Sequence, residues 1–377
     1  MGQPLQPSEL MRSARRITVK VGSSLLVDKN GLRREWIRAL GADLAELALE
    51  GRKLVVVSSG AVALGRAKLG LKPAMRLDAK QAAAAAGQPL LMRAWDEALG
   101  VHGMATAQLL LTIGDTETRR SWLNARATLD VLLQNGALPI VNENDSVATE
   151  ELRYGDNDRL SARVAQMVQS DLLILLSDVD GLYTADPARD AVAEHVPTVA
   201  DIAAATSWAG PAASGGIGTG GMRTKLAAAK IAQAFGCATI IASGKEDHPL
   251  QALVEGRAKA TVVQATGSPD RAYKQWIAGS LAPSGTLAVD EGAARALLGG
   301  KSLLPSGVRQ VEGDFERGAC LCITDETGVE LARGICRYGS GEARAILGIR
   351  ASEIPVRLGY SRGDELIHRD DMVLTRC

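Results

Sequence analysis

The stretch that decides the fold is Ile17-Thr18-Val19-Lys20-Val21-Gly22-Ser23-Ser24, near the start of a chain of 377 residues. Its first five residues form a β-branched run typical of a buried strand, and the next three are typical of the turn that ends one. Lys20 is the exception, because burying an ammonium group without a partner is costly. It either pairs structurally, extends its charge to the surface, or awaits an anionic partner, and we favour the last interpretation.

The same pattern continues to about residue 263, where short apolar runs alternate with longer Ala- and Leu-rich segments. Apolar strands separated by helices indicate an α/β fold, with a mostly parallel sheet between two layers of helices. The predicted later strands are 54–57, 137–141, 172–176 and 239–242, and the predicted helices are 36–50, 79–99, 159–169 and 225–235.

The exits of these strands share one chemistry, since glycine, serine, asparagine or aspartate follows each apolar run. The carboxyl ends of parallel strands meet at one edge of the sheet, where open α/β proteins bind ligands. For any single exit, the favoured interpretation is that these residues simply end a strand or cap a helix. Taken together with Lys20, the exits favour a binding site for an anion; they are 22–24, 58–60, 142–145, 177–178 and 243–244.

Two polar clusters carry the strongest functional signal. Asn142-Glu143-Asn144-Asp145 closes one strand, and Gly155-Asp156-Asn157-Asp158 opens the next helix. Carboxamides offer both donors and acceptors, and a carboxylate can hold an ammonium group or orient a lysine. The clusters therefore predict a pocket for a small zwitterionic or anionic substrate.

A glycine-rich segment, 214–225, ends in Met222-Arg223-Thr224-Lys225. Its glycines satisfy GxGxxG, but no strand directly precedes them, and the Walker spacing GxxxxGK[ST] fails. A disordered linker is the simplest alternative. A flexible loop that leads into a helix with an early lysine instead favours binding of a nucleotide's outer phosphates.

Composition excludes several classes of protein. The chain has 43 basic and 43 acidic residues, so nucleic-acid binding driven by bulk charge is not expected. Five cysteines without a CxxC pair favour a reducing, cytoplasmic setting, and the four scattered histidines give no transition-metal spacing. No apolar stretch reaches the length of a signal peptide or a membrane span.

The pattern changes after residue 264. Gly, Ser and Pro cluster in 265–284, which we interpret as a linker between a domain at 14–264 and a second at 285–377. The second domain reads as short strands separated by Gly and Asp turns, after a helix at 291–298, and this is typical of a small β-rich barrel.

Six ordered motifs resemble the amino acid kinase superfamily, and the C-terminal part resembles a PUA domain, through 289–293 and 302–308. Within the superfamily the resemblance is to members that phosphorylate the γ-carboxylate of L-glutamate. The kinase motifs are 19–24, 57–62, 141–145, 155–158, 178–187 and 218–225.

The resemblance implies transfer of the γ-phosphoryl group of ATP to L-glutamate in proline biosynthesis. The nucleophile is an ionised carboxylate, so the enzyme needs cations and alignment rather than a general base. The implied catalytic residues are Lys20 and Lys225, oriented by Asp158. Ser59, Asp145 and Asn157 would hold glutamate, with Asp145 facing the α-ammonium and the other two donating to carboxylates. ATP would contact Lys20, Ser177, Asp178, Thr219, Gly220, Gly221, Met222, Arg223, Thr224 and Lys225.

The resemblance also implies that Mg²⁺ is carried mainly by the phosphates, with no metal site built by the protein. It implies feedback inhibition by L-proline, a homo-oligomer, and a product passed to glutamate-5-semialdehyde dehydrogenase. Two alternative interpretations of the function are a kinase for acetylglutamate, aspartate, carbamate or UMP, and an RNA-binding protein that uses the PUA-like module. Aromatic residues make up only 3% of the chain, which disfavours RNA stacking.

Overall fold

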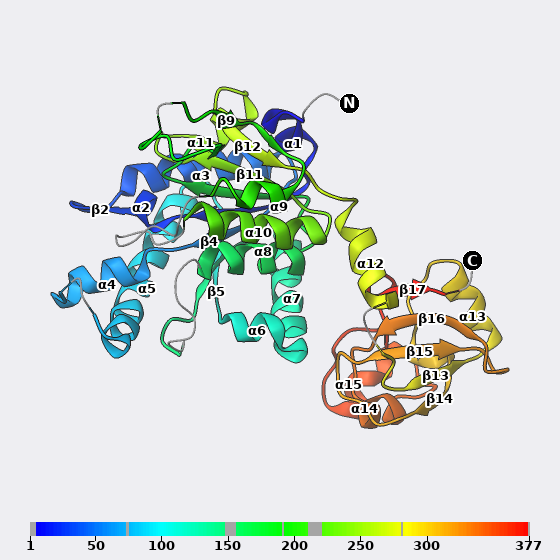
Figure 1. Ribbon diagram of the computed structural model, residues 1–377. Coiled ribbons are helices and arrows are strands. Elements are labelled where there is room, and N and C mark those ends of the chain that lie inside the picture. The colour runs from blue at the N-terminus through cyan, green and yellow to red at the C-terminus, as the bar shows by residue number, and fades with distance from the viewer. Residues whose placement is uncertain are drawn as a thin grey trace. The chain divides into compact units, whose positions relative to one another are not determined.

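The computed structural model describes residues 5–72, 75–147, 156–190, 192–209, 221–279 and 282–375. The chain divides into two units, Met1–Pro269 and Asp270–Cys377 (Figure 1). Each unit has its own hydrophobic core and its own sheet.

The first unit is built on an eight-stranded sheet, and the prediction of a mostly parallel sheet with helices is confirmed. Only β12 runs antiparallel to a neighbour, β11. The other pairs are parallel, including both neighbours of the central strand β1. In order across the sheet the strands are β10 (Thr198–Val199), β12 (Ala260–Val263), β11 (Ala238–Ser243), β7 (Leu172–Ser177), β1 (Arg16–Val21), β4 (Lys53–Ser58), β6 (Leu138–Glu143) and β5 (Thr106–Leu111).

The two faces of the sheet bury different residues of the same strand. In β7 the even-numbered leucine and isoleucine side chains belong to one core and the odd-numbered leucines to the other. In β1, Ile17, Val19 and Val21 belong to the first core. Because side chains alternate along a strand, Lys20 points to the opposite face. The strand pattern that makes β1 buried thus also fixes the direction of its lysine.

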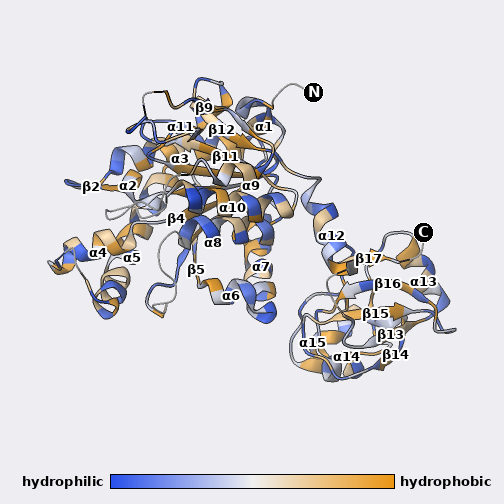
Figure 2. Ribbon diagram, viewed as in Figure 1, coloured by the Kyte–Doolittle hydropathy of each residue, from blue (hydrophilic) through white to orange (hydrophobic). Residues whose placement is uncertain are grey.

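Each face is covered by its own helices. The first core includes residues of α1 (Pro7–Ser13), α3 (Arg34–Leu49), α5 (Leu77–Gly100) and α11 (Pro249–Val254). The second includes residues of α8 (Asp156–Met167), α9 (Ile202–Thr206) and α10 (Met222–Ala234), and α8 and α10 lie side by side (Figure 1). Helix α7 (Arg119–Gln134) contacts α8 and β6. Strands β11 and β12 are mainly hydrophobic, whereas the helices alternate between the two colours (Figure 2), as expected for one buried face each.

Helices α4 (Ala61–Leu69) and α5 cross in backbone contact. A Cβ atom built on Gly65 would lie 1.6 Å from the carbonyl oxygen of Ala83, and one on Gly87 would lie 1.8 Å from that of Ala61. Real Cβ atoms cannot approach a carbonyl so closely, so glycine is required at both positions. This contact fixes the segment of α5 that carries Gln88.

The remaining elements of this unit are short. They are α2 (Ser23–Leu26), α6 (Ile113–Glu117), and two hairpins, β2 (Val27–Asp28) with β3 (Gly31–Leu32) and β8 (Leu182–Tyr183) with β9 (His195–Val196). No helix in the described ranges combines the length and the apolar character needed to span a bilayer.

The second unit contains a five-stranded sheet, which confirms the predicted β-rich module. Its core includes Leu287, Leu321, Ile323 and Tyr338. In sheet order the strands are β14 (Val308–Glu312), β13 (Thr286–Val289), β15 (Cys320–Thr324), β16 (Glu330–Ile335) and β17 (Met372–Leu374); the helices are α13 (Glu291–Leu298), α14 (Ser340–Ala345) and α15 (Ile354–Leu358), with 3₁₀ turns at Pro305–Gly307, Ala351–Glu353 and Arg369–Asp371.

The segment interpreted as a linker contains a helix, α12 (Pro269–Gly279). Tyr273 and Ile277 are buried, the Tyr273 hydroxyl donates to Asp371 at 3.0 Å, and Arg333 donates to the carbonyl of Ala278 at 3.2 Å. From Asp270 onward α12 therefore belongs to the second unit.

Candidate functional site

The candidate site lies at the carboxyl ends of the central strands. Strand β1 has β4 on one side and β7 on the other, so the chain leaves β1 in one direction and later returns on its other side. Open parallel sheets bind ligands at such points, outside the carboxyl ends of the strands. Strands β1, β4, β6 and β7, with the turns that follow them, carry Lys20, Ser59, Asp145, Ser177 and Asp178, whereas α8 carries Asn157 and Asp158 and α10 carries Met222, Arg223, Thr224 and Lys225.

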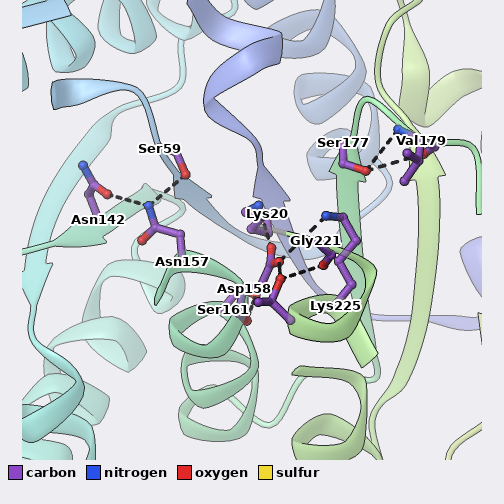
Figure 3. A network of polar contacts seen from close by, with 11 residues as sticks. Lys20, Ser59, Asn142, Asn157, Asp158, Ser161, Ser177, Val179, Gly221 and Lys225 are labelled. Carbon is purple, nitrogen blue, oxygen red and sulfur yellow. Dashed lines mark hydrogen bonds and ion pairs between the residues drawn. The ribbon is translucent and has the colours of Figure 1, made fainter. Parts of the chain in front are cut away.

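At the centre of the site, one carboxylate lies between two lysines. Lys20 Nζ from β1 is 2.6 Å from Asp158 Oδ1, and Lys225 Nζ from α10 is 3.9 Å from Asp158 Oδ2 (Figure 3). Thr224 donates its hydroxyl to Asp158 Oδ2 at 2.6 Å. The side chain of Asp158 is fully buried, and the two lysines are 7% and 3% exposed. The cluster therefore places two buried cations around one buried carboxylate, an arrangement suited to an anionic ligand.

The pKa shifts follow from this arrangement. Burial alone would raise the pKa of Asp158, but the charges of Lys20 and Lys225 and hydrogen bonds from Lys20 and Thr224 outweigh it and lower the pKa. Burial lowers the pKa of Lys225; the attraction of Asp158 opposes this shift, and the nearby charge of Lys20 adds to it. Asp158 is thus held in its ionised form. An additional anion near Lys225 would favour the charged form of this lysine.

An amide network occupies the β4–β6 side of the site. Asn157 Nδ2 from α8 donates to Ser59 Oγ at 2.8 Å and to Asn142 Oδ1 at 3.1 Å (Figure 3). Asn142 Nδ2 donates in turn to Gln88 Oε1 of α5 at 2.8 Å. Asn157 and Asp158 are consecutive residues at the start of α8, so this helix joins the amide network to the lysine cluster. Asp145, in the turn after β6, is half-buried.

The other side of the lysine cluster carries the residues predicted to hold the nucleotide. The Ser177 hydroxyl at the end of β7 contacts the backbone of Val179, at 3.4 Å from its nitrogen and 3.5 Å from its oxygen (Figure 3). Asp178 is exposed, and its charge acts on the pKa of Lys225. The exit of β7 thus lies near the start of α10.

The glycine-rich loop is described only from Gly221, which precedes α10, and the predicted residues Thr219 and Gly220 lie outside the described ranges. Met222 is half-buried and packs against the second core, while Arg223 is exposed and donates to the carbonyl of Ala209 at 3.2 Å. In the described part of the chain, no three His, Cys, Asp or Glu side chains gather as metal ligands.

Sequence reasoning missed Gln88 and the contact of Thr224 with Asp158. Gln88 lies in a segment predicted as helix, far from the polar clusters in the sequence, and only its position between Gly87 and Pro89 marks it as unusual. Thr224 was predicted as a nucleotide ligand, and in this structure its hydroxyl donates a hydrogen bond to Asp158. Contacts of this kind between distant segments leave no local pattern.

The lowered pKa of Lys225 predicts the pH dependence of the reaction. A lysine whose pKa is depressed loses its charge at lower pH than usual, so kcat/KM for ATP should fall as the pH rises through that depressed pKa. Bound phosphates favour the charged form of Lys225, so kcat, which reports the enzyme with substrate bound, should fall at a higher pH than kcat/KM does. The measurement is the pH profile of both constants. Because arginine stays charged over the whole pH range, Lys225→Arg should move the fall of kcat/KM to higher pH. Identical limbs for wild type and variant would contradict the assignment.

Comparison with known proteins agrees with this architecture. The sequence profile described as "Amino acid kinase family" matches residues 15–243, and the PUA domain profile matches residues 285–357. The chain is 56% identical over 367 residues to the glutamate 5-kinase of Caulobacter vibrioides strain NA1000 / CB15N, covering 96% of this chain and 97% of the relative. It is 53% identical to glutamate 5-kinase 1 of Rhizobium meliloti strain 1021 (97% and 93% covered) and 51% identical to the glutamate 5-kinase of Brucella ovis (97% of each). The chain therefore belongs to the amino acid kinase family and, within that family, to the glutamate 5-kinases.

Proposed function

We propose that the protein transfers the γ-phosphoryl group of ATP to the γ-carboxylate of L-glutamate, giving L-glutamyl 5-phosphate and ADP, the first step of proline biosynthesis. The observation that carries the proposal is the buried pair of lysines around Asp158, with the amide network attached to it through Asn157. The names of the relatives supply the substrate, and the geometry supports the chemistry.

The reaction needs little covalent help from the protein. The attacking carboxylate is already ionised, so the work is to bring two anions into line and to neutralise charge on the transferring group. Lys20 and Lys225 reach the central position from two different elements, and Asp158 holds both ammonium groups in place. Because the cluster is buried, its charges are weakly screened and act strongly on the transition state.

The acceptor and the nucleotide would lie on opposite sides of this cluster. Ser59, Asp145 and Asn157 line the β4–β6 side and would hold glutamate, with Asp145 toward the α-ammonium. Lys20, Ser177, Asp178 and the segment 219–225 would hold ATP, aided by the backbone amides at the N-terminus of α10. The γ-phosphate then falls beside the lysines.

The nucleotide's magnesium ion would be held mainly by the phosphates. Both oxygens of Asp158 are occupied, one by Lys20 and the other by Thr224, so this carboxylate is not open as a metal ligand. When bound, Mg²⁺ neutralises part of the phosphate charge. A cytoplasmic location, inhibition by L-proline at the glutamate site, a homo-oligomer and transfer of the product to a dehydrogenase fit this role and follow from the same resemblance.

The test is a panel of acceptors. ATP consumption with hydroxylamine trapping of the acyl phosphate should respond to L-glutamate and not to N-acetyl-L-glutamate, L-aspartate or carbamate. Protein carrying Lys20→Ala, purified in parallel, controls for contaminating kinases. Turnover with one of the other acceptors and none with L-glutamate would overturn the proposal.

The two units should separate at Pro269. All residues given roles lie in the first unit, so a chain ending at Pro269 should remain soluble and keep glutamate-dependent phosphoryl transfer. A chain ending at Trp276 keeps Tyr273 without its partner Asp371 and exposes its ring, which should promote aggregation. Activity and light scattering on both chains check this expectation. A soluble, monodisperse but inactive shorter chain would show that the second unit contributes to catalysis.

A further inference from the structure

The amide network has a fixed direction. Asn142 Oδ1 accepts two hydrogen bonds, from the backbone nitrogen of Glu143 at 2.9 Å and from Asn157 Nδ2 at 3.1 Å. Its other end is therefore the nitrogen, which can only donate. The group that meets this nitrogen must be an acceptor, and Gln88 Oε1 lies there at 2.8 Å. Gln88 is thus the acceptor at which the network ends.

The direction of the network decides what Asn157 offers to a ligand. Both hydrogens of its amide nitrogen are used, one by Ser59 and one by Asn142. Its oxygen, Oδ1, is buried and has no hydrogen-bond partner among the described residues. Asn157 therefore presents an acceptor, which differs from the donor role expected from the sequence. An acceptor suits an ammonium group and repels a carboxylate.

Gln88 is well placed to hold this direction. It is 9% exposed, and its own Nε2 is buried without a partner in the described ranges. The backbone contact between Gly87 and Gly65 prevents α5 from shifting relative to α4, which begins two residues after Ser59. Gln88, at one end of the network, is thereby held in place relative to the helix that follows Ser59, at the other end.

We propose that Gln88 is a positioning residue that fixes Asn157 with its oxygen toward the acceptor substrate, so that the site selects a free α-ammonium group. Gln88 acts through Asn142 and does not itself touch the reacting atoms. Asn157 Oδ1 and the carboxylate of Asp145 then recognise the ammonium group together, and the Ser59 hydroxyl, which accepts from Asn157, directs its own hydrogen to a substrate carboxylate. The inference rests on the proposed function, since it concerns the acceptor of that reaction.

The test compares L-glutamate with glutarate, which has both carboxylates but no α-ammonium. Gln88→Met removes the acceptor at nearly constant volume and leaves the Asn142 nitrogen without its partner. The kcat/KM for L-glutamate should fall about tenfold, the usual effect of one unpaired buried polar group, while that for glutarate stays unchanged. The ratio of the two constants therefore falls about tenfold. Gln88→Glu retains an oxygen for Asn142 and should restore most of the ratio.

The matched control is Leu91→Ala, a fully buried core residue of the same helix outside the network. A general loosening of α5 would lower both constants in parallel and leave their ratio intact. Asn142→Ala cuts the network at the next residue and should reproduce the loss of ratio, also if Gln88→Met fails to fold. An unchanged ratio in the folded variants overturns the role of Gln88, whereas absence of glutamate turnover in the wild type overturns the proposed function instead.

Discussion

Lys20→Ala and Lys225→Ala should each lower kcat about 10²- to 10³-fold, the range found when one preorganised charge or donor is removed from a transition state. KM for L-glutamate should change far less. Charge on the transferring group is greatest in the transition state, so a cation aimed there acts mainly on kcat. Both ammonium groups are buried and held by Asp158, so neither can be replaced by solvent. Steady-state kinetics with either substrate varied would measure the effect.

Lys230→Ala is the matched control for Lys225. Lys230 lies on the exposed face of the same helix and should keep wild-type kinetics. If either buried-lysine variant turned over as fast as Lys230→Ala, the proposed role of that lysine would be wrong.

Asp158→Asn should lower both stability and activity. The substitution keeps the shape of the side chain but removes the buried counter-charge that both lysines contact, which typically costs about 3–5 kcal/mol of unfolding free energy. Activity should fall as well, because the ammonium groups lose the carboxylate that positions them. Urea denaturation and kcat of the same preparation measure the two effects.

Two further measurements connect the loss to electrostatics. Asp158→Asn combined with Lys225→Met should be more stable than Asp158→Asn alone, because one of the two buried cations that repel each other is removed. The pKa of Asp158 is lowered in the folded state, so its contribution to stability is present above its unfolded pKa and is lost as the pH falls through the folded value. The stability gap between wild type and Asp158→Asn should therefore narrow in acid. A gap that is constant with pH would indicate a packing defect instead.

Much of the fold could be predicted because each central strand is a simple apolar run with a polar exit. The lysine inside the apolar run of β1 marked Lys20, and the polar start of α8 marked Asn157 and Asp158. Strand β5 was missed because it lies at the edge of the sheet, and its mixed exposure gives no continuous apolar signal. Helix α12 was missed because Gly, Ser and Pro at both ends concealed its amphipathic middle.

The candidate site was predictable only where its residues follow strands. Gln88 comes from the middle of a helix, and its meeting with Asn142 depends on how α5 packs on the sheet. The direction of the amide network likewise depends on the backbone nitrogen of Glu143, which no side-chain pattern reveals.

The crossing of α4 and α5 at Gly65 and Gly87 has a consequence for how this enzyme could acquire new substrates. Helix α4, which begins two residues after Ser59, and helix α5, which carries Gln88, meet through their main chains at Gly65 and Gly87 with no room for even a methyl group. Rotamer changes cannot relieve a collision with a carbonyl oxygen, so α4 and α5 behave as one rigid unit. Directed evolution toward bulkier acids should therefore recover substitutions that change side chains along these two helices, and almost none that separate the helices.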